Sequence, residues 1–398
     1  MRYYLPPLIA IVLLAACAAP LRQAQGTLQL RGGRPERSAA KLKDARRSVQ
    51  GAATPPTLAW QYTAALPFTA RAAAGGGLVV IAPGGETIVA LAAADGAILW
   101  EYKGKVHPRS LVVGDGLIFA GTPGGGLIAL DAASGELRWQ TALVGDAVYP
   151  PALRAGRLYA ATSFVGPGLE PRPGKHGWLY AIQAADGQTL WARETNAYLL
   201  VTPAVDEMLL IAGGSFRGAE TDEGGHMRLV ALAPDDGREL WQYDSEDGLL
   251  KSLAFDEARV YYLAYRDTLF ALDRADGQPL WNYDTENWSP GFAFADGTLY
   301  FGSDNAFVHA VAGADGSQLW RVHLEGVFNA PRAEPLIDGG RLYFQSNDES
   351  IYALDRATGQ IVWQTPPQVR SRVGLALADG LLYLVGTDNT LYAYALTP

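Results

Sequence analysis

The 398-residue sequence contains a single cysteine, Cys17. No intramolecular disulfide can form, so stability must come from a packed core, which a hydrophobic content of 49% can supply. Charged residues make up only 18% of the chain, whereas glycine (45 residues) and tryptophan (10 residues) are abundant. This composition favours an all-β protein with short strands, tight turns and aromatic anchors.

The sequence also lacks the short motifs that commonly carry catalysis. It has no H-E-x-x-H zinc motif, no C-x-x-C pair and no phosphate-binding glycine loop. Gly124-Gly125-Gly126 lies between two apolar runs and is interpreted as a hairpin tip. The histidines His107, His309 and His323 are isolated in the sequence and are interpreted as structural. We therefore expect no catalytic residue, no cofactor and no bound metal.

Basic charge is scarce outside one segment. Residues 18–57 hold eight Arg and Lys against two acidic residues, a net charge of +6. Subtracting this and the charge of Arg2 from the total of −9 leaves −16 for residues 58–398. An acidic body argues against nucleic-acid binding, which needs a basic footprint. Residues 18–57 are interpreted as a flexible linker, and contact of this segment with an anionic membrane surface is the alternative.

The first 17 residues have the pattern of a secretory signal. Arg2 precedes an apolar run from Leu8 to Ala16, which is too short to span a bilayer as a mature helix. The run ends Leu-Ala-Ala-Cys at Cys17 and resembles the lipobox of bacterial lipoproteins. This resemblance implies that Cys17 is lipidated and becomes the first residue of the mature chain. An ordinary signal peptide that happens to contain a cysteine is the alternative.

From Trp60 onward, a unit of about 40 residues repeats. Each unit contains short apolar runs, a turn with glycine and then a tryptophan. A period near 40 with four short strands per unit is typical of β-propeller blades. We expect every repeat tryptophan to be buried and to donate its indole N–H to a backbone acceptor. The repeat tryptophans are Trp60, Trp100, Trp139, Trp191, Trp241, Trp281, Trp320 and Trp363.

The number of blades follows from the two ends of the repeat region. Seven complete units end at Trp363, and three further apolar runs follow, the last of them Leu391–Tyr394. Leu58–Tyr62 has the pattern of an outer strand with no strands before it. The fragments together make one more blade, so residues 58–398 are predicted to form an eight-bladed β-propeller of four-stranded antiparallel blades, closed by N- and C-terminal strands. Seven blades with a stray N-terminal strand is the alternative.

The repeat resembles a known family pattern, Ala-x-Asp-x-x-Thr-Gly-x-x-x-Trp, of quinoprotein-type propellers. Ala353 to Trp363 matches it throughout, and the units ending at Trp281 and Trp139 match with Asp or Ser in place of Thr. Two groups share this repeat. Quinone dehydrogenases hold pyrroloquinoline quinone and a metal in the channel, typically beside a vicinal cysteine pair. Lipoproteins resembling BamB are accessory subunits of the outer-membrane β-barrel assembly machinery. Size, signal, lipobox and blade number fit the second group, and the cysteine-free propeller departs from the first.

Two neighbouring units carry insertions at the same place, between their second and third strands. The insertions span residues 163–177 and 213–227, and we expect both to emerge on one face of the ring. Trp288, in the connection into the sixth blade, should open on that face. The predicted partner-binding residues are Phe164, Arg172, Phe216, Arg217 and Trp288. A functionless insertion is one alternative, and a metal site built around His176 and His226 is another.

Charged side chains are also predicted near the mouth of the central channel. They are Arg71, Arg109, Lys251, Glu334 and Arg372, and we interpret them as solvated charges around a water-filled channel. This set lacks the oxygen-rich ligand cluster that Ca²⁺ prefers.

Three functions are compatible with the sequence. The favoured one is a monomeric, membrane-anchored scaffold that binds another envelope protein. In a host with two membranes, the BamB resemblance implies the periplasmic face of the outer membrane and the β-barrel assembly machinery. With one membrane, the protein would lie on the outer face of the cytoplasmic membrane. The alternatives are a quinone-dependent oxidoreductase and a propeller that binds a small ligand or glycan.

Overall fold

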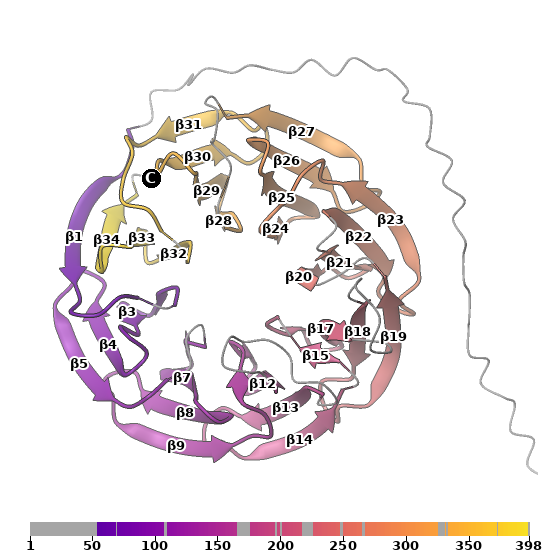
Figure 1. The fold of residues 1–398 in the computed structure, drawn as a ribbon, viewed down its shortest axis with the longest axis horizontal. Helices are drawn as coiled ribbons and strands as arrows, with labels where there is room; N and C mark the ends of the chain where they lie inside the picture. The colour runs from indigo at the N-terminus through magenta and orange to yellow at the C-terminus, as the bar shows by residue number, and fades with distance from the viewer. Residues whose placement is uncertain are drawn as a thin grey trace, which may run out of the picture. The chain divides into compact units, whose positions relative to one another are not determined.

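The computed structural model describes residues 54–68, 70–106, 110–164, 176–195, 197–199, 201–216, 226–246, 250–264, 267–324, 331, 333–371 and 373–396. These residues form strands and turns, grouped into eight antiparallel sheets arranged as a ring (Figure 1). Among the described residues, no helix is long and apolar enough to cross a membrane. The predicted eight-bladed propeller is confirmed, and the seven-bladed alternative is wrong.

Blades 1 to 4 follow one another along the chain, and each is built from its inner to its outer strand. Blade 1 contains β2 (Ala73–Gly75), β3 (Leu78–Ile81), β4 (Thr87–Ala92) and β5 (Ile98–Lys103); blade 2 contains β6 (Val112–Gly114), β7 (Leu117–Thr122), β8 (Gly126–Asp131) and β9 (Leu137–Ala142). Blade 3 contains β10 (Ala147–Val148), β11 (Ala152–Arg154), β12 (Arg157–Ser163), β13 (Trp178–Gln183) and β14 (Thr189–Glu194); blade 4 contains β15 (Tyr198–Leu199), β16 (Ala204–Val205), β17 (Leu210–Phe216), β18 (His226–Leu232) and β19 (Glu239–Ser245).

Blades 5 to 7 have four strands each, and blade 8 takes its outer strand from the N-terminal side of the chain. Blade 5 contains β20 (Leu250–Phe255), β21 (Arg259–Ala264), β22 (Thr268–Asp273) and β23 (Pro279–Asp284); blade 6 contains β24 (Phe292–Ala295), β25 (Thr298–Ser303), β26 (Phe307–Ala312) and β27 (Gln318–His323). Blade 7 contains β28 (Leu336–Asp338), β29 (Arg341–Gln345), β30 (Ile351–Asp355) and β31 (Ile361–Gln364); blade 8 contains β32 (Leu375–Ala378), β33 (Leu381–Val385), β34 (Thr390–Ala395) and β1 (Thr57–Thr63).

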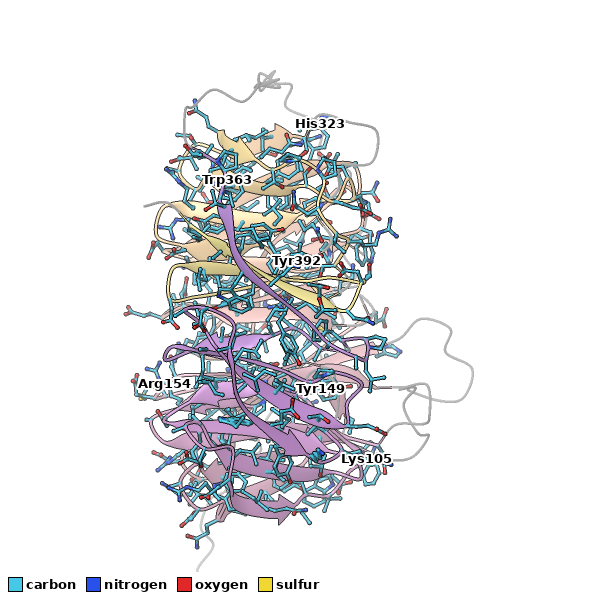
Figure 2. The ribbon with its side chains drawn as sticks, turned by 90° about the vertical axis from the view of Figure 1, so that its left-hand side faces the viewer. Lys105, Tyr149, Arg154, His323, Trp363 and Tyr392 are labelled. Carbon is cyan, nitrogen blue, oxygen red and sulfur yellow. The ribbon has the colours of Figure 1, made fainter. Side chains whose placement is uncertain are left out.

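The ring has two faces that differ in the connections they carry. We define the turn face as the face that carries two turns of each blade. These turns connect the first strand to the second and the third strand to the fourth. The opposite face, with the turns between second and third strands and the connections to the next blade, is the loop face. Figure 2 shows Arg154 on the turn face and Lys105 and His323 on the loop face. The first residue of β1, Thr57, is paired with the last residue of β34, Ala395, on the turn face.

The hydrophobic core lies between neighbouring blades. The second and third strands are apolar on both sides, as in β7 and β8, because each side packs against another blade. One cluster, for example, joins Val80 and Trp100 of blade 1 to Ile118 and Ile128 of blade 2. Each blade therefore needs both neighbours to bury its sheet.

The outer strand of every blade contains a β-bulge immediately before its tryptophan. In blade 5, Ala271 pairs with Trp281 and Leu272 with Pro279, so Leu280 is the extra residue. A bulge increases the local twist and re-aims the following side chain. It also disrupts the outer edge of the sheet, which would otherwise be open to pairing with another chain. The bulge residues are Ala59, Leu99, Arg138, Leu190, Leu240, Leu280, Leu319 and Val362.

The tryptophan then joins its blade to the next one. Trp241 of blade 4 donates its indole N–H to the carbonyl oxygen of Arg274 in blade 5, at 2.8 Å. Its ring lies against Gly277 of the following turn, where φ is +72° and an added Cβ would come within 2.6 Å of the ring. Glycine is required there both for the positive φ and for the close approach of the ring. The same contact pairs Trp60 with Gly96, Trp100 with Gly135, Trp139 with Gly187, Trp191 with Gly237, Trp281 with Gly316 and Trp320 with Gly359.

The repeat tryptophans are less uniformly buried than predicted. Five of them, including Trp60 and Trp363, are at most 9% exposed, whereas Trp191, Trp281 and Trp320 are only half-buried. These indoles lie on the outermost strands, at the outer border of the interface between two blades, where one edge of the indole is exposed to solvent. The expected backbone acceptor is present for the seven indoles that face a turn of the next blade.

Ring closure uses both ends of the propeller. β1 pairs antiparallel with β34, from Thr57 opposite Ala395 to Thr63 opposite Thr390 (Figure 1). β1 also supplies Trp60, which donates to the Ala93 carbonyl of blade 1 at 2.8 Å. Trp363 of blade 7 meets no third-to-fourth-strand turn, because β34 and β1 come from opposite ends of the chain. It packs instead in a cluster with Tyr394 and Leu396.

A histidine is fully buried within blade 6. The ring of His309 is stacked on Phe301, with centroids 4.8 Å apart. One ring nitrogen lies 3.1 Å from the Tyr283 hydroxyl and the other 3.3 Å from the Ser303 hydroxyl. Burial, assisted by the charge of Arg321, lowers the pKa of His309 to about 3. The neutral ring has one donor and one acceptor for its two hydroxyl neighbours, which supports the predicted structural role.

Removal of β1 tests ring closure. Deleting residues 58–63 should lower the free energy of unfolding by more than the roughly 3–5 kcal/mol expected for loss of one buried tryptophan. It removes both the outer strand of blade 8 and the Trp60 contact with blade 1. Deletion of residues 20–50 is the control and should leave stability unchanged. Equal denaturant midpoints for the two deletions would contradict closure by β1.

Burial of His309 predicts a dependence of stability on pH. Below the ordinary pKa of 6.5 the unfolded chain binds a proton that the native state does not bind until pH about 3. As the pH decreases through this range, the free energy of unfolding should therefore fall, by at most about 1.4 kcal/mol per pH unit from this group. Denaturant unfolding between pH 7 and 4 should show a shallower slope for His309→Gln than for the parent. His176→Gln, at a side chain that is 41% exposed, is the control. An unchanged slope in His309→Gln would refute the assignment.

Candidate functional site

The two predicted insertions connect second to third strands in blades 3 and 4. The first lies between β12 and β13 and the second between β17 and β18, so both open on the loop face. Arg172 and Arg217 lie outside the described residues. Phe164 follows β12 and is half-buried, and Phe216 is the last residue of β17. The predicted location of the insertions is confirmed, and the binding roles of these residues stay predictions.

The sheets of blades 3 and 4 extend further toward the loop face at their inner edge. β12 pairs with β11 and, further along, with the short strand β10, where Ala147 lies opposite Ser163. β17 pairs in the same way with β16 and then with β15, where Tyr198 lies opposite Ser215. Each insertion therefore begins from a hairpin supported on its inner side by an extra short strand.

Hydrogen bonds hold the base of the first insertion in place. Thr162 donates its hydroxyl to the Val144 carbonyl at 2.5 Å, and the Tyr180 hydroxyl accepts the Val144 N–H at 2.8 Å. At the far end of the insertion, the Thr195 hydroxyl donates to the Gly177 carbonyl at 2.9 Å. Sequence reasoning missed these supports. The signal was available in part, because β12 is longer than its counterparts in most blades.

A tryptophan outside the repeat pattern also marks this region. Trp178 begins β13, directly after the first insertion, and stacks on Tyr180 with centroids 6.2 Å apart. It is half-buried. Of the ten tryptophans, only Trp178 and Trp288 are not explained by the repeat. Both lie at loop-face ends of the blades, so the loop face holds the two tryptophans that the repeat does not explain.

Trp288 lies where the sequence predicted, in the connection between β23 and β24. Its carbonyl oxygen accepts the N–H of Asp304, at 2.8 Å, and Asp304 belongs to the turn between β25 and β26. That turn lies on the loop face. The Trp288 side chain is 37% exposed, and the Lys251 ammonium lies 5.0 Å from its ring centroid.

Two of the predicted charges at the channel mouth, Lys251 and Glu334, are paired and not solvated as expected, whereas Arg71 is exposed. Lys251 is only 10% exposed and donates to an Asp267 carboxylate oxygen at 2.9 Å and to the Ser289 carbonyl at 3.0 Å. Glu334, just before β28, accepts a hydrogen bond from the Ser252 hydroxyl of blade 5. Burial raises the pKa of Glu334, and the Ser252 hydrogen bond and the Arg71 charge oppose that rise.

Glu334 reaches Ser252 by passing over blade 6. A Cβ at Gly291 would lie 2.4 Å from the Glu334 side chain, so the absence of a side chain at that position opens the path. Arg71, just before β2 of blade 1, donates to the Val373 carbonyl, just before β32 of blade 8, at 3.3 Å. Arg109 and Arg372 lie outside the described residues. The sequence predicted these charges but not their pairing, because the partners are distant in the sequence, and Ser252 and Glu334 come from different blades.

Within the described part of the chain, no three His, Cys, Asp or Glu side chains gather as metal ligands would. His176 lies 3.8 Å from Glu194 at the end of the first insertion, and His226 begins β18. A cavity of about 260 Å³ lies between the β1–β2 connection and the β33–β34 turn. Its lining includes Phe68, Val373 and Val385 and has no charged side chain. That lining combines apolar side chains with the polar Thr387 and Asn389.

A family model described as outer membrane protein assembly factor BamB matches residues 104–225, 175–287 and 284–397. A curated relative, the outer membrane protein assembly factor BamB of Moranella endobia (strain PCIT), is 28% identical over 107 residues. That alignment covers 25% of this chain and 27% of the relative, so the chain spans about a quarter of the relative's length.

Solved structures with the same fold include both groups that share the repeat. BamB from Moraxella catarrhalis has a TM-score of 0.63 at 17% identity, covering 86% of this chain and 100% of that one. A quinohemoprotein alcohol dehydrogenase from Comamonas testosteroni has a TM-score of 0.63 at 14% identity, covering 85% and 76%. Likeness at these identities shows the fold alone. The family model spans most of the propeller, and on that ground the chain belongs to the BamB family of outer membrane protein assembly factors.

Proposed function

We propose that this protein is a non-catalytic, lipid-anchored scaffold that binds another envelope protein and assists the assembly of outer-membrane proteins. Membership of the BamB family is the observation that carries this proposal. The proposed partner is a component of the β-barrel assembly machinery. The proposed location is the periplasmic face of the outer membrane.

The architecture of the ring supports docking on the loop face. On the turn face, glycine turns pack against the repeat tryptophans of the preceding blades. Ion pairs between blades, such as Arg154–Glu207 and Arg274–Asp206, also lie there. Both ends of the ring also lie there. Turns on the loop face receive no tryptophan, so they can vary in length without disturbing these contacts. We propose that Phe164, Arg172, Phe216, Arg217 and Trp288 form the binding surface, since aromatic residues and arginine often dominate binding energy.

The lipobox-like sequence supports anchoring through Cys17. The mature protein should carry acyl chains on Cys17 and lack residues 1–16. Two or more chains are needed for stable anchoring, because a single chain binds membranes only marginally. Mass spectrometry of the protein from its native host should show this modification, and Cys17→Ser should fractionate with soluble proteins. An unmodified Cys17 in the membrane fraction would contradict the proposed anchor.

Shortening both insertions tests the binding surface. Residues 164–176 and 217–225 would each be replaced by a three-residue turn like Pro123–Gly125 of blade 2, so that the hydrogen bonds of Gly177 are kept. Stability should change little, because the entropy of loop closure depends only logarithmically on length. Affinity for the purified β-barrel assembly protein of the same organism should fall at least about tenfold, or 1.4 kcal/mol.

The control for this experiment lies on the opposite face. Met208, 75% exposed in the turn between β16 and β17, is replaced by alanine, and affinity should not change. An equal affinity for the parent and the loop-shortened protein would place the binding surface elsewhere. If the parent itself does not bind the assembly protein, the proposed partner is wrong.

A further inference from the structure

The loop face contains an exposed aromatic residue whose backbone is hydrogen-bonded to blade 6 and whose ring contacts a lysine of blade 5. The carbonyl oxygen of Trp288 accepts the Asp304 N–H, and its ring lies over the Lys251 ammonium. Lys251 is itself held by Asp267 and by the Ser289 carbonyl. A side chain that is already ordered before binding loses less entropy when a partner docks. Trp288 is thus a pre-organised contact site.

The charges around Trp288 differ in exposure. Asp284 at the end of β23, Glu286 in the following connection and Asp304 in the turn bonded to it are exposed. The cations near them are more covered, since the Lys251 and Arg321 side chains are 10% and 22% exposed. Arg321 pairs with Glu286 at 2.8 Å and lies over the ring of Phe307. The exposed charges of this region are therefore acidic. We call Asp284, Glu286, Trp288 and Asp304 the Trp288 platform.

We propose that the Trp288 platform binds a Lys- or Arg-rich segment of the partner protein. This inference rests on the proposed function, because it specifies the chemistry of the partner. A cationic side chain is attracted to an indole face, and the Lys251 ammonium already makes such a contact with the Trp288 ring. The exposed carboxylates of Asp284, Glu286 and Asp304 supply negative charge that attracts neighbouring cations of the segment, although Glu286 already pairs with Arg321. Complementary charge of this kind sets specificity and speeds association.

The test uses the full-length protein in detergent and a fluorescent twelve-residue peptide in which arginine alternates with glycine and serine. Anisotropy titrations at low salt should give a dissociation constant that rises at least about tenfold in Trp288→Ala and severalfold in Glu286→Gln. The matched controls are Met208→Ala and Glu207→Gln on the turn face. There, an exposed apolar side chain adjoins a carboxylate that is paired with Arg154.

Equal losses in the platform variants and their controls would mean diffuse attraction to an acidic protein and would overturn the proposal. So would an unchanged dissociation constant in Trp288→Ala. Deletion of residues 20–50 removes most of the basic segment of this chain. If that deletion tightens peptide binding tenfold, the platform's occupant is the chain itself, and the partner assignment is wrong.

A second measurement separates this inference from the proposed function. Binding of the purified β-barrel assembly protein is measured for Trp288→Ala and for the loop-shortened protein. Loss in both supports the platform as part of the docking surface. Loss only on loop shortening refutes the platform and leaves the proposed function standing. No binding by the parent refutes the proposed function. The peptide titration remains an independent test of the Trp288 platform in that case.

Discussion

The contact between a tryptophan of one blade and a glycine turn of the next is the interaction on which the ring depends. The indole supplies apolar area and one hydrogen bond, and the glycine supplies a positive φ and the space for the ring. The bulge before each tryptophan directs the indole toward the neighbouring blade. Sheets that bury both sides cannot be stable alone, so these contacts make eight small sheets into one structure. At blade 8 the chain ends replace a hairpin, and β1 provides the missing strand and its tryptophan.

The two faces of the propeller differ in how many structural contacts they carry. The turn face carries the tryptophan contacts, several ion pairs and both ends of the ring. The loop face has fewer constraints, and there blades 3 and 4 have gained longer hairpins with supporting strands β10 and β15. Trp178 and Trp288, which the repeat does not require, lie on the same face. A rigid ring with one variable face suits a protein that works by holding others.

Much of the fold could be predicted from the sequence because its cause is periodic. The regular tryptophans and Gly-containing turns fix the blade boundaries, and the partial units at each end fix the number of blades. Other features depend on residues that meet only in three dimensions. The hydrogen bond from Ser252 to Glu334 joins blade 5 to blade 7, with blade 6 between them. No periodicity in the sequence predicts this contact. The strands β10 and β15 are two residues long and have no periodic signal. The predicted burial was wrong for Trp191, Trp281 and Trp320, because the repeat does not show how far each indole reaches into solvent.

The central claim is that the loop face, and not the turn face, holds the partner. Photo-crosslinking tests it most directly. A photoreactive phenylalanine analogue is placed at Trp288 or at Met208 in the full-length protein, which is then mixed with the purified β-barrel assembly protein in detergent. The account predicts a crosslinked product from position 288 and none from position 208. Crosslinking from position 208 with none from position 288 would contradict it.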